Sequence, residues 1–270
     1  MEILSRFLSV VVGGTLSWFG GHHAMLSLLP LSVLTGAAML WTFARTSDQA
    51  GIRKIKQRLS AYLYEMRLFT DEPLLIWKAQ CGLLVSNVRY LSKMLFPALI
   101  LSVPMLLIFP EIESFYGYHP LAPGREAVVT MQMKDQGRGQ VPLLRAPEGI
   151  EVESPPVSVE GGRQLSWRIR ALHPVTGTLD FVFPTQTISK SVQAGSAPQY
   201  LSERRVSSLF DLLRYPAEPR LHADSVDWIQ IRYSKATVHA LGLDLHWVVW
   251  LVILSMISAL FLKGRFKVSF

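Results

Sequence analysis

The stretch His222-Ala223-Asp224-Ser225 contains the residue types of a hydrolase triad. In such a triad a histidine takes a proton from a serine hydroxyl while an aspartate orients the imidazole, so the side chains must converge in space. Neighbouring positions in one loop do not converge in this way by themselves. We therefore interpret the stretch as loop sequence, and we do not predict an enzyme.

Other patterns that would indicate catalysis or metal binding are missing from the sequence. It contains no Walker loop, no dinucleotide-binding fingerprint, no HExxH and no GxSxG. His22-His23 could supply two imidazole ligands, but no Cys, Asp or Glu lies near them to complete a site. The single cysteine, Cys81, excludes a disulfide framework. We expect no cofactor and no metal.

The apolar residues are concentrated in three runs, 24–43, 94–109 and 245–262, that contain no Lys, Arg, Asp or Glu. Because a helix of roughly 20 apolar residues crosses a bilayer, we predict transmembrane helices over residues 24–43, 94–109 and 244–262. A fourth run, at 7–19, is shorter and is broken by Gly13-Gly14. Residues 1–23 are interpreted as an interfacial segment entering the membrane, with a further span or a signal peptide as the alternatives.

Charge asymmetry orients these predicted spans. Residues 44–93 hold nine Lys and Arg against four Asp and Glu, and the tail at 263–270 is basic without any acid. Because basic loops remain cytoplasmic, both segments are predicted to be cytoplasmic. Residues 110–243 then lie on the opposite side. The expected location is the bacterial inner membrane, and the net charge of +7 is assigned to membrane orientation, not to DNA binding.

Residues 44–93 are predicted to form two helices folded onto each other. A polar turn ending in Pro73 separates them, and proline suits a first helical turn because its missing N–H is not needed there. On each side of the turn, apolar residues alternate at three and four positions, the spacing of a coiled-coil seam. The predicted seam comprises Ile52, Ile55, Leu59, Tyr62, Met66 and Phe69 on the first helix, and Leu74, Trp77, Cys81, Leu84, Val88 and Leu91 on the second.

We predict that this hairpin projects into the cytoplasm. A pair of helices lying on the membrane surface, or packed against the spans, are the alternatives. Basic residues between Arg53 and Arg58 fall mainly off the seam. We interpret them as a solvated face, although just below a bilayer they could also hold anionic lipid or RNA phosphates.

The segment between the second and third spans has the texture of β-structure. Short alternating runs at 127–134, 149–153, 164–171, 179–183, 187–192 and 227–233 are separated by turn residues. They predict a small antiparallel β-sandwich, with one short helix near 207–214. Aromatic residues such as Tyr116, Trp247 and Trp250 flank the domain, and we expect them to anchor the outer membrane interface.

The order of inward span, basic helical hairpin and outward span resembles the core of the YidC/Oxa-type insertase superfamily. The proline-bearing run MLFPALILSVPMLLIF, with Pro97 and Pro104, is similar to the span that follows the hairpin in bacterial insertases. The likeness covers about residues 20–110 and the last span. The predicted fold class is thus an α+β membrane protein with three or four transmembrane helices, a cytoplasmic antiparallel coiled-coil hairpin and an extracytoplasmic β-sandwich.

The resemblance implies a hydrophilic groove, open to lipid, that receives a client polypeptide. Hydroxyl residues such as Thr35, Ser102 and Ser255 would wet the groove. Arg45, Arg89 and Lys93 are the expected residues of its mouth, although basic residues at helix ends are also routine interfacial anchors. The expected partners are membrane lipids, hydrophobic client segments or the ribosome, and an envelope protein for the β-sandwich. The alternative is a non-catalytic structural or assembly subunit of an envelope complex.

Overall fold

The computed structural model describes residues 24–69, 71–135, 139–196 and 200–266. The predicted N-terminal segment with its His22-His23 pair, and the last residues of the basic tail, lie outside the described residues. The chain divides into two compact units. Of the described residues, we call 106–250 the β unit, with which 24–28 are grouped, and 29–105 and 251–266 the helical unit.

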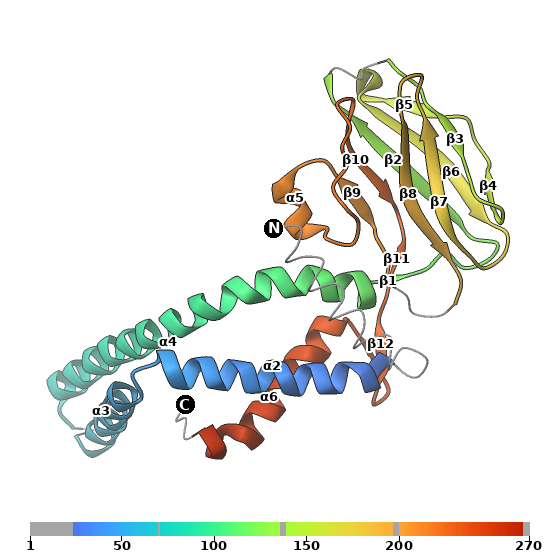
Figure 1. Cartoon of the computed structure of the whole chain (residues 1–270). Helices are drawn as coiled ribbons and strands as arrows, with labels where there is room; N and C mark the ends of the chain where they lie inside the picture. Colours follow the sequence, from blue (N-terminus) through green and yellow to red (C-terminus); the bar gives the residue numbers. More distant parts are fainter. Residues whose placement is uncertain (1–23, 70, 136–138, 197–199, 267–270) are drawn as a thin grey trace. The chain divides into compact units, whose positions relative to one another are not determined.

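Among the described residues, three helices are long and apolar enough to cross a membrane: α2 (Ala24–Thr46), α4 (Pro73–Tyr116) and α6 (Trp247–Phe266) (Figure 1). They contain the predicted spans at 24–43 and 94–109 and most of the one at 244–262. The helix α4 has 44 residues and joins the second predicted hairpin arm to the second predicted span. At 1.5 Å per residue it is about 66 Å long, roughly twice the thickness of a bilayer's hydrocarbon core.

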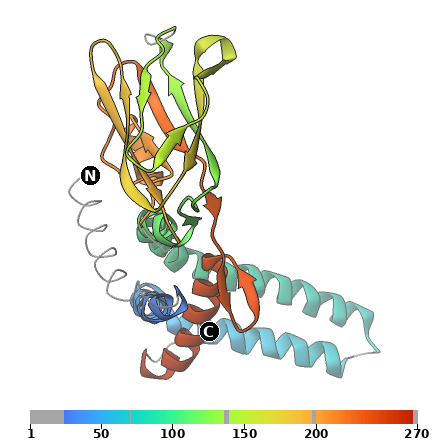
Figure 2. The ribbon, with the colours of Figure 1, turned by 90° about the vertical axis from the view of Figure 1, so that its right-hand side faces the viewer.

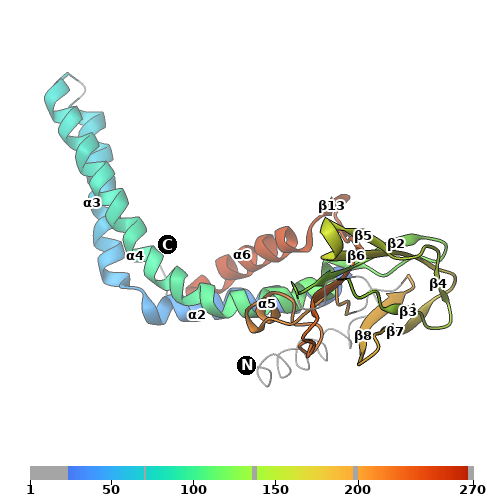
Figure 3. The ribbon, with the colours of Figure 1, turned by 90° about the horizontal axis from the view of Figure 1, so that it is seen from above.

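The first predicted hairpin arm is the helix α3 (Gln49–Leu68). Asp48 caps its start, because its side-chain oxygen accepts the Gly51 N–H at 2.9 Å. After a short turn, α4 begins at Pro73, the position at which proline's missing N–H is harmless. Figure 3 shows α3 lying beside the first half of α4, and α4 bending where it leaves α3.

The β unit contains two main antiparallel sheets, visible from a second side in Figure 2. The larger has the order β4-β6-β2-β10-β9, with β5 also paired to β6, and the smaller has the order β3-β7-β8. The strands are β2 (Glu126–Met133), β3 (Leu143–Arg145), β4 (Ile150–Val152), β5 (Val157–Val159), β6 (Gln164–Ala171), β7 (Val175–Val182), β8 (Thr187–Ala194), β9 (Arg204–Val206) and β10 (Val226–Ile231).

Two short strand pairs, one α-helix and the 3-10 helix η2 (Glu160–Gly162) complete the described part of the β unit. The strand β1 (Tyr118–His119) pairs with β11 (Ser234–Lys235), and β12 (Val238–Ala240) pairs with β13 (Leu243–Leu245). The helix α5 (Leu209–Arg214) is capped by Ser208. Leu241 and Gly242 connect β12 to β13 with positive φ angles of 52° and 78°, as a two-residue hairpin turn requires.

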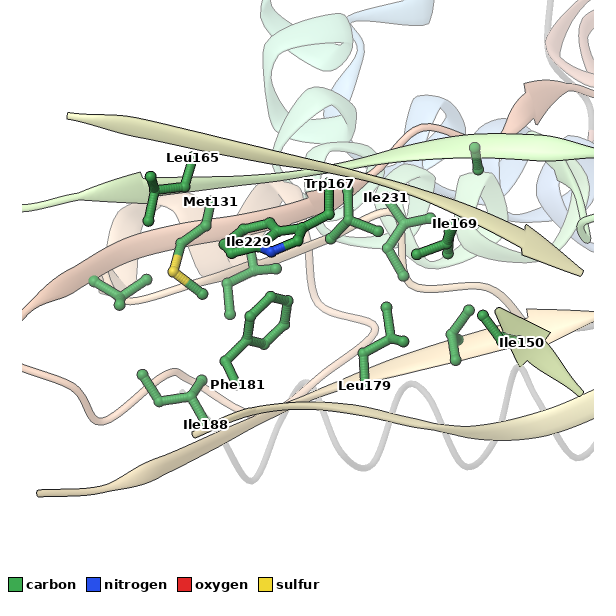
Figure 4. Close-up of a cluster of buried hydrophobic side chains, with 14 of the residues drawn as sticks. Met131, Ile150, Leu165, Trp167, Ile169, Leu179, Phe181, Ile188, Ile229 and Ile231 are labelled. Carbon is green, nitrogen blue, oxygen red and sulfur yellow. The ribbon is translucent and has the colours of Figure 1, made fainter. Parts of the chain in front are cut away.

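Both sheets contribute side chains to one hydrophobic core (Figure 4). Every second residue of β2 is buried, from Ala127 to Met133, and β6 shows the same alternation around Trp167. Trp167 meets Phe181 of β7 edge to face, with ring centroids 5.3 Å apart. The alternation arises because successive strand side chains point to opposite faces of a sheet.

The six segments predicted to be strands contain β2, β4, β6, β7, β8 and β10 or overlap with them. The helix predicted near 207–214 is α5. The strands β3, β5 and β9 have only three residues each, which is too short to give a periodic signal.

Candidate functional site

The helical unit contains an open cleft of about 450 Å³ bounded by α2, α4 and α6. Ser255 is the one hydroxyl residue in its lining, and its Oγ donates to the Val252 carbonyl at 3.0 Å. The cleft is therefore apolar. Its lining residues are Met39, Leu40, Phe43, Leu101, Val252, Ser255, Met256, Ala259 and Leu260.

Close packing of α2 against α6 forms one side of this cleft. A Cβ added to Gly36 would lie 2.7 Å from the Ser255 carbonyl oxygen and 3.2 Å from the Ser258 Cβ. Only glycine permits this approach, and small residues commonly bring helices together in membranes. The remaining lining side chains are left around an open space instead of filling it.

The hydroxyl residues that were expected to wet a groove bond to their own helices. Thr35 Oγ1 donates to the Leu31 carbonyl and Ser102 Oγ donates to the Leu99 carbonyl, each at 2.8 Å. Helix carbonyls can satisfy hydroxyl groups in this way without solvent. This cleft differs from the hydrophilic groove that the resemblance implied.

The three cations predicted at a groove mouth do not line the cleft. The Arg45 guanidinium lies 5.7 Å from the centre of the Trp41 ring and Lys93 forms an ion pair with Asp48, while Arg89 is exposed. The Lys93 ammonium holds the pKa of Asp48 below its usual range. Lys93 thus ties the start of α3 to α4, and the role of all three residues toward a client remains a prediction.

On α3, the predicted seam is the less exposed side of the helix. Ile52 and Ile55 are buried, and Leu59, Tyr62 and Met66 are half-buried. Phe69, at the end of the helix, leaves 40% of its surface exposed. These residues lie on the side of α3 that carries its contacts.

On α4, the predicted seam is wrong. Leu74, Trp77, Leu84, Val88 and Leu91 leave between 60% and 85% of their surface exposed, and Cys81 is exposed as well. None of the six is buried against α3. We call these six residues, Leu74, Trp77, Cys81, Leu84, Val88 and Leu91, the apolar stripe.

The face of α4 that meets α3 combines small residues with the half-buried Ile76, Leu83 and Tyr90. Ala79 and Ser86 are buried, and a Cβ added to Gly82 would lie 2.6 Å from the Tyr62 ring. Tyr62 therefore packs directly over the α4 backbone. A search for large apolar residues at seam spacing selects the opposite side of α4, because small residues with little hydrophobic signal occupy the most buried positions of the contact face.

The triad-like stretch does not form a catalytic arrangement among the described residues. His222 and Asp224 are exposed, while Ser225 is buried and its Oγ accepts a hydrogen bond from Gln186 at 3.1 Å. The nearby Lys134 Nζ donates to the Ala223 carbonyl at 3.1 Å. The stretch is a loop bonded to its surroundings. Nor do the described residues contain a group of three His, Cys, Asp or Glu side chains able to hold a metal ion.

Within the β unit, a polar cluster connects the end of α4, the start of α6 and Tyr200. Trp247 Nε1 donates to Glu113 Oε2 at 2.6 Å, and the Tyr200 hydroxyl donates to the buried Glu111. Burial, followed by the neighbouring carboxylate, raises the pKa of Tyr200 well above its usual range, so this hydroxyl stays protonated. Trp247 and Trp250 are buried in protein, in contrast to the predicted interfacial anchors.

Sequence reasoning also missed a buried lysine. Lys190 of β8 is fully buried, and its Nζ lies 3.0 Å from Glu218 Oε2 and donates to the Ser202 carbonyl at 2.6 Å. Burial lowers the pKa of Lys190 and Glu218 opposes this shift. The alternation of β8 places position 190 inside the core, but only the fold brings Glu218 to it. The pair is shielded from water inside the β unit, since the side chain of Glu218 is only 11% exposed.

Comparison of the chain with protein-family models, with curated proteins and with solved structures finds no match.

Proposed function

We propose that this chain is an integral membrane protein that assists the insertion or folding of other membrane proteins. In this proposal α2, α4 and α6 cross the membrane, and an apolar segment of a client rests in the cleft between them. The observation that carries the proposal is the cleft itself, about 450 Å³ of apolar space among three helices able to span a membrane.

The proposed topology follows the charges. The α3–α4 hairpin and the basic C-terminus lie in the cytoplasm of a bacterium, because the basic residues concentrate there. The β unit, a β-sandwich in this proposal, lies on the other side of the inner membrane. The order of elements remains similar to that of the YidC/Oxa-type insertases.

The proposed mode of action differs from that of a polar groove. Because the cleft offers almost no hydrogen-bonding groups, it would hold the apolar part of a client and not its polar flank. Transfer into the bilayer would then be a lateral exchange between similar apolar surroundings, which needs neither cofactor nor energy source.

Photo-crosslinking tests this function. A photoreactive residue at Met256, which lines the cleft, should crosslink to a nascent single-span membrane protein, whereas one at the neighbouring Ile257, which is not a lining residue, should crosslink much less. Met256→Trp should partly fill the cleft and slow insertion several-fold, with Ile257→Trp as the matched control. Equal crosslinking from both positions, with normal insertion in the Met256→Trp variant, would contradict the proposal.

A second candidate function is that of a non-catalytic assembly subunit whose β unit binds an envelope protein. Its support is the exposed apolar side chains of two short strands, Leu143 on β3 and Val157 and Val159 on β5. Exposed strands of this kind can accept a partner strand. Two results would favour this function over insertion. The protein would co-purify stably with one envelope complex, and Leu143→Lys would abolish this, while deletion of the gene would leave client insertion unimpaired.

A further inference from the structure

The packing of α3 against α4 is more typical of helices in lipid than of helices in water. Ala79, Gly82 and Ser86 lie on the less exposed side of α4 together with the half-buried Ile76, Leu83 and Tyr90, while the apolar stripe points away from α3. In water the reverse arrangement would remove more apolar surface from solvent. In lipid, large apolar side chains gain nothing by leaving the solvent, and small residues let helices approach closely. The arrangement therefore indicates lipid against the stripe.

The apolar stripe continues without a break into the predicted span of the same helix. Leu95, Leu99 and Val103 repeat its spacing and leave between 58% and 62% of their surface exposed. In a spanning helix these side chains would meet acyl chains. Lipid acyl chains can thus cover the whole exposed apolar face of α4 from Leu74 to Val103.

Pro97 lies on the face of α4 opposite this stripe. Residues two positions apart are separated by about 200° around a helix, so Pro97 is opposite both Leu95 and Leu99. A proline ring clashes with the preceding turn and bends the helix away from its own side. The bend of α4 seen in Figure 3 is then expected to be concave on the side of the stripe, which turns the stripe toward the membrane surface.

Exposed basic residues lie on both helices of the hairpin, and those on α4 flank the stripe. Lys78 and Arg89 are exposed on α4, and on α3 a further group is exposed: Arg53, Lys54, Lys56 and Arg58. An apolar helix face with basic flanks is the pattern of helices that lie in the interface between acyl chains and headgroups.

We infer that the α3–α4 hairpin lies along the membrane surface as an interfacial pair. The apolar stripe of α4 is seated among acyl chains just below the phosphates of an anionic bilayer, and α3 lies on the water side. This inference rests on the proposed function only in that α2, α4 and α6 cross a membrane. It replaces the prediction of a hairpin projecting into the cytoplasm.

The single native cysteine provides the probe. The full chain is labelled at Cys81 with an environment-sensitive fluorophore and reconstituted in vesicles of equal parts phosphatidylcholine and phosphatidylglycerol. A lipid carrying a spin label near its headgroup should quench the fluorophore at Cys81 strongly. Iodide dissolved in the water should quench it only weakly. In a second protein, Gln57→Cys in a Cys81→Ser background, iodide should quench the label several-fold more. Gln57 is exposed on α3.

Two further variants separate the outcomes. Val88→Glu should reduce lipid quenching at Cys81 several-fold, whereas Asn87→Glu, at the neighbouring exposed position, should not. Equal iodide quenching at Cys81 and Gln57→Cys, or shielding of Cys81 from both quenchers by a protein, would overturn the inference. A label at Val103→Cys in the Cys81→Ser background reports whether the predicted spanning segment of α4 lies in lipid. If it is quenched from lipid while Cys81 is not, the hairpin inference fails and the spanning helices stand.

Discussion

The core of the β unit and the helix α4 place their large apolar side chains differently. In the β unit, Trp167, Phe181 and Ile229 are buried in one core. In the helical unit, Trp77, Leu84 and Val88 are exposed, while Ala79 and Ser86 are buried. A single physical rule produces both patterns if the solvents differ, because apolar side chains avoid water but are indifferent to lipid.

The largest expected effect compares two tryptophans. Trp167→Ala removes a side chain that is 2% exposed and should lower the free energy of unfolding of the β unit by about 3–5 kcal/mol. Trp77→Ala removes one that is 67% exposed and should change the stability of the protein by less than about 0.5 kcal/mol. Urea unfolding in detergent, followed by near-ultraviolet circular dichroism, measures both variants. Similar losses in the two would show that the stripe is packed against protein.

A smaller effect is expected where α2 packs on α6. Gly36→Val places side-chain atoms against the Ser255 carbonyl, and this overpacking should cost about 1–3 kcal/mol by forcing the helices apart. Gly264→Ala is the control, because nothing lies within 4 Å of its added Cβ. Thermal unfolding of the two variants in detergent measures the difference. If Gly36→Val unfolds like the control, the helices do not approach as closely as described.

The smallest effect concerns the start of α3. Asp48→Asn removes the carboxylate that pairs with Lys93, while an amide oxygen can still cap the helix. Exchange of the first α3 amides, followed by mass spectrometry, should become modestly faster at pH 7. The pKa of Asp48 is lowered in the folded state. Its ion pair with Lys93 therefore stabilises the fold at pH values above the unfolded-state pKa of Asp48, and this stabilisation is lost as the pH falls through the folded-state pKa. The difference between variant and parent should therefore vanish in acid. Asp71→Asn, at an exposed position in the turn, should leave this exchange unchanged.

The sequence predicted the β unit better than the helix pairing. Alternation around Val129 and Trp167 marks strands because one face of each sheet meets a core and the other does not. The same logic failed for Leu84 and Val88, because it assumes that large apolar residues leave their solvent. Gly82 and Ser86 carry almost no hydropathy signal, so the true contact face of α4 emerged only from the structure.

The candidate cleft was not predictable from residue patterns. Its lining comes from three helices far apart in the chain, and it exists because Gly36 brings α2 and α6 together. The resemblance to insertases led to the expectation of polar groups at such a groove. The ion pair of Lys190 with Glu218 in the β unit was not predictable for the same reason, because its two residues are 28 positions apart and only folding brings them together.

Labelling from the two sides of a sealed membrane tests the proposed topology most directly, because it predicts that α3 faces the cytoplasm and that the β unit faces the opposite side of the membrane. In a Cys81→Ser background, single cysteines replace Gln57 on α3 and Leu143 on β3, both exposed. An impermeant maleimide should label Leu143→Cys only from outside in spheroplasts and Gln57→Cys only in inverted vesicles. Labelling of both positions from the same side would contradict this account.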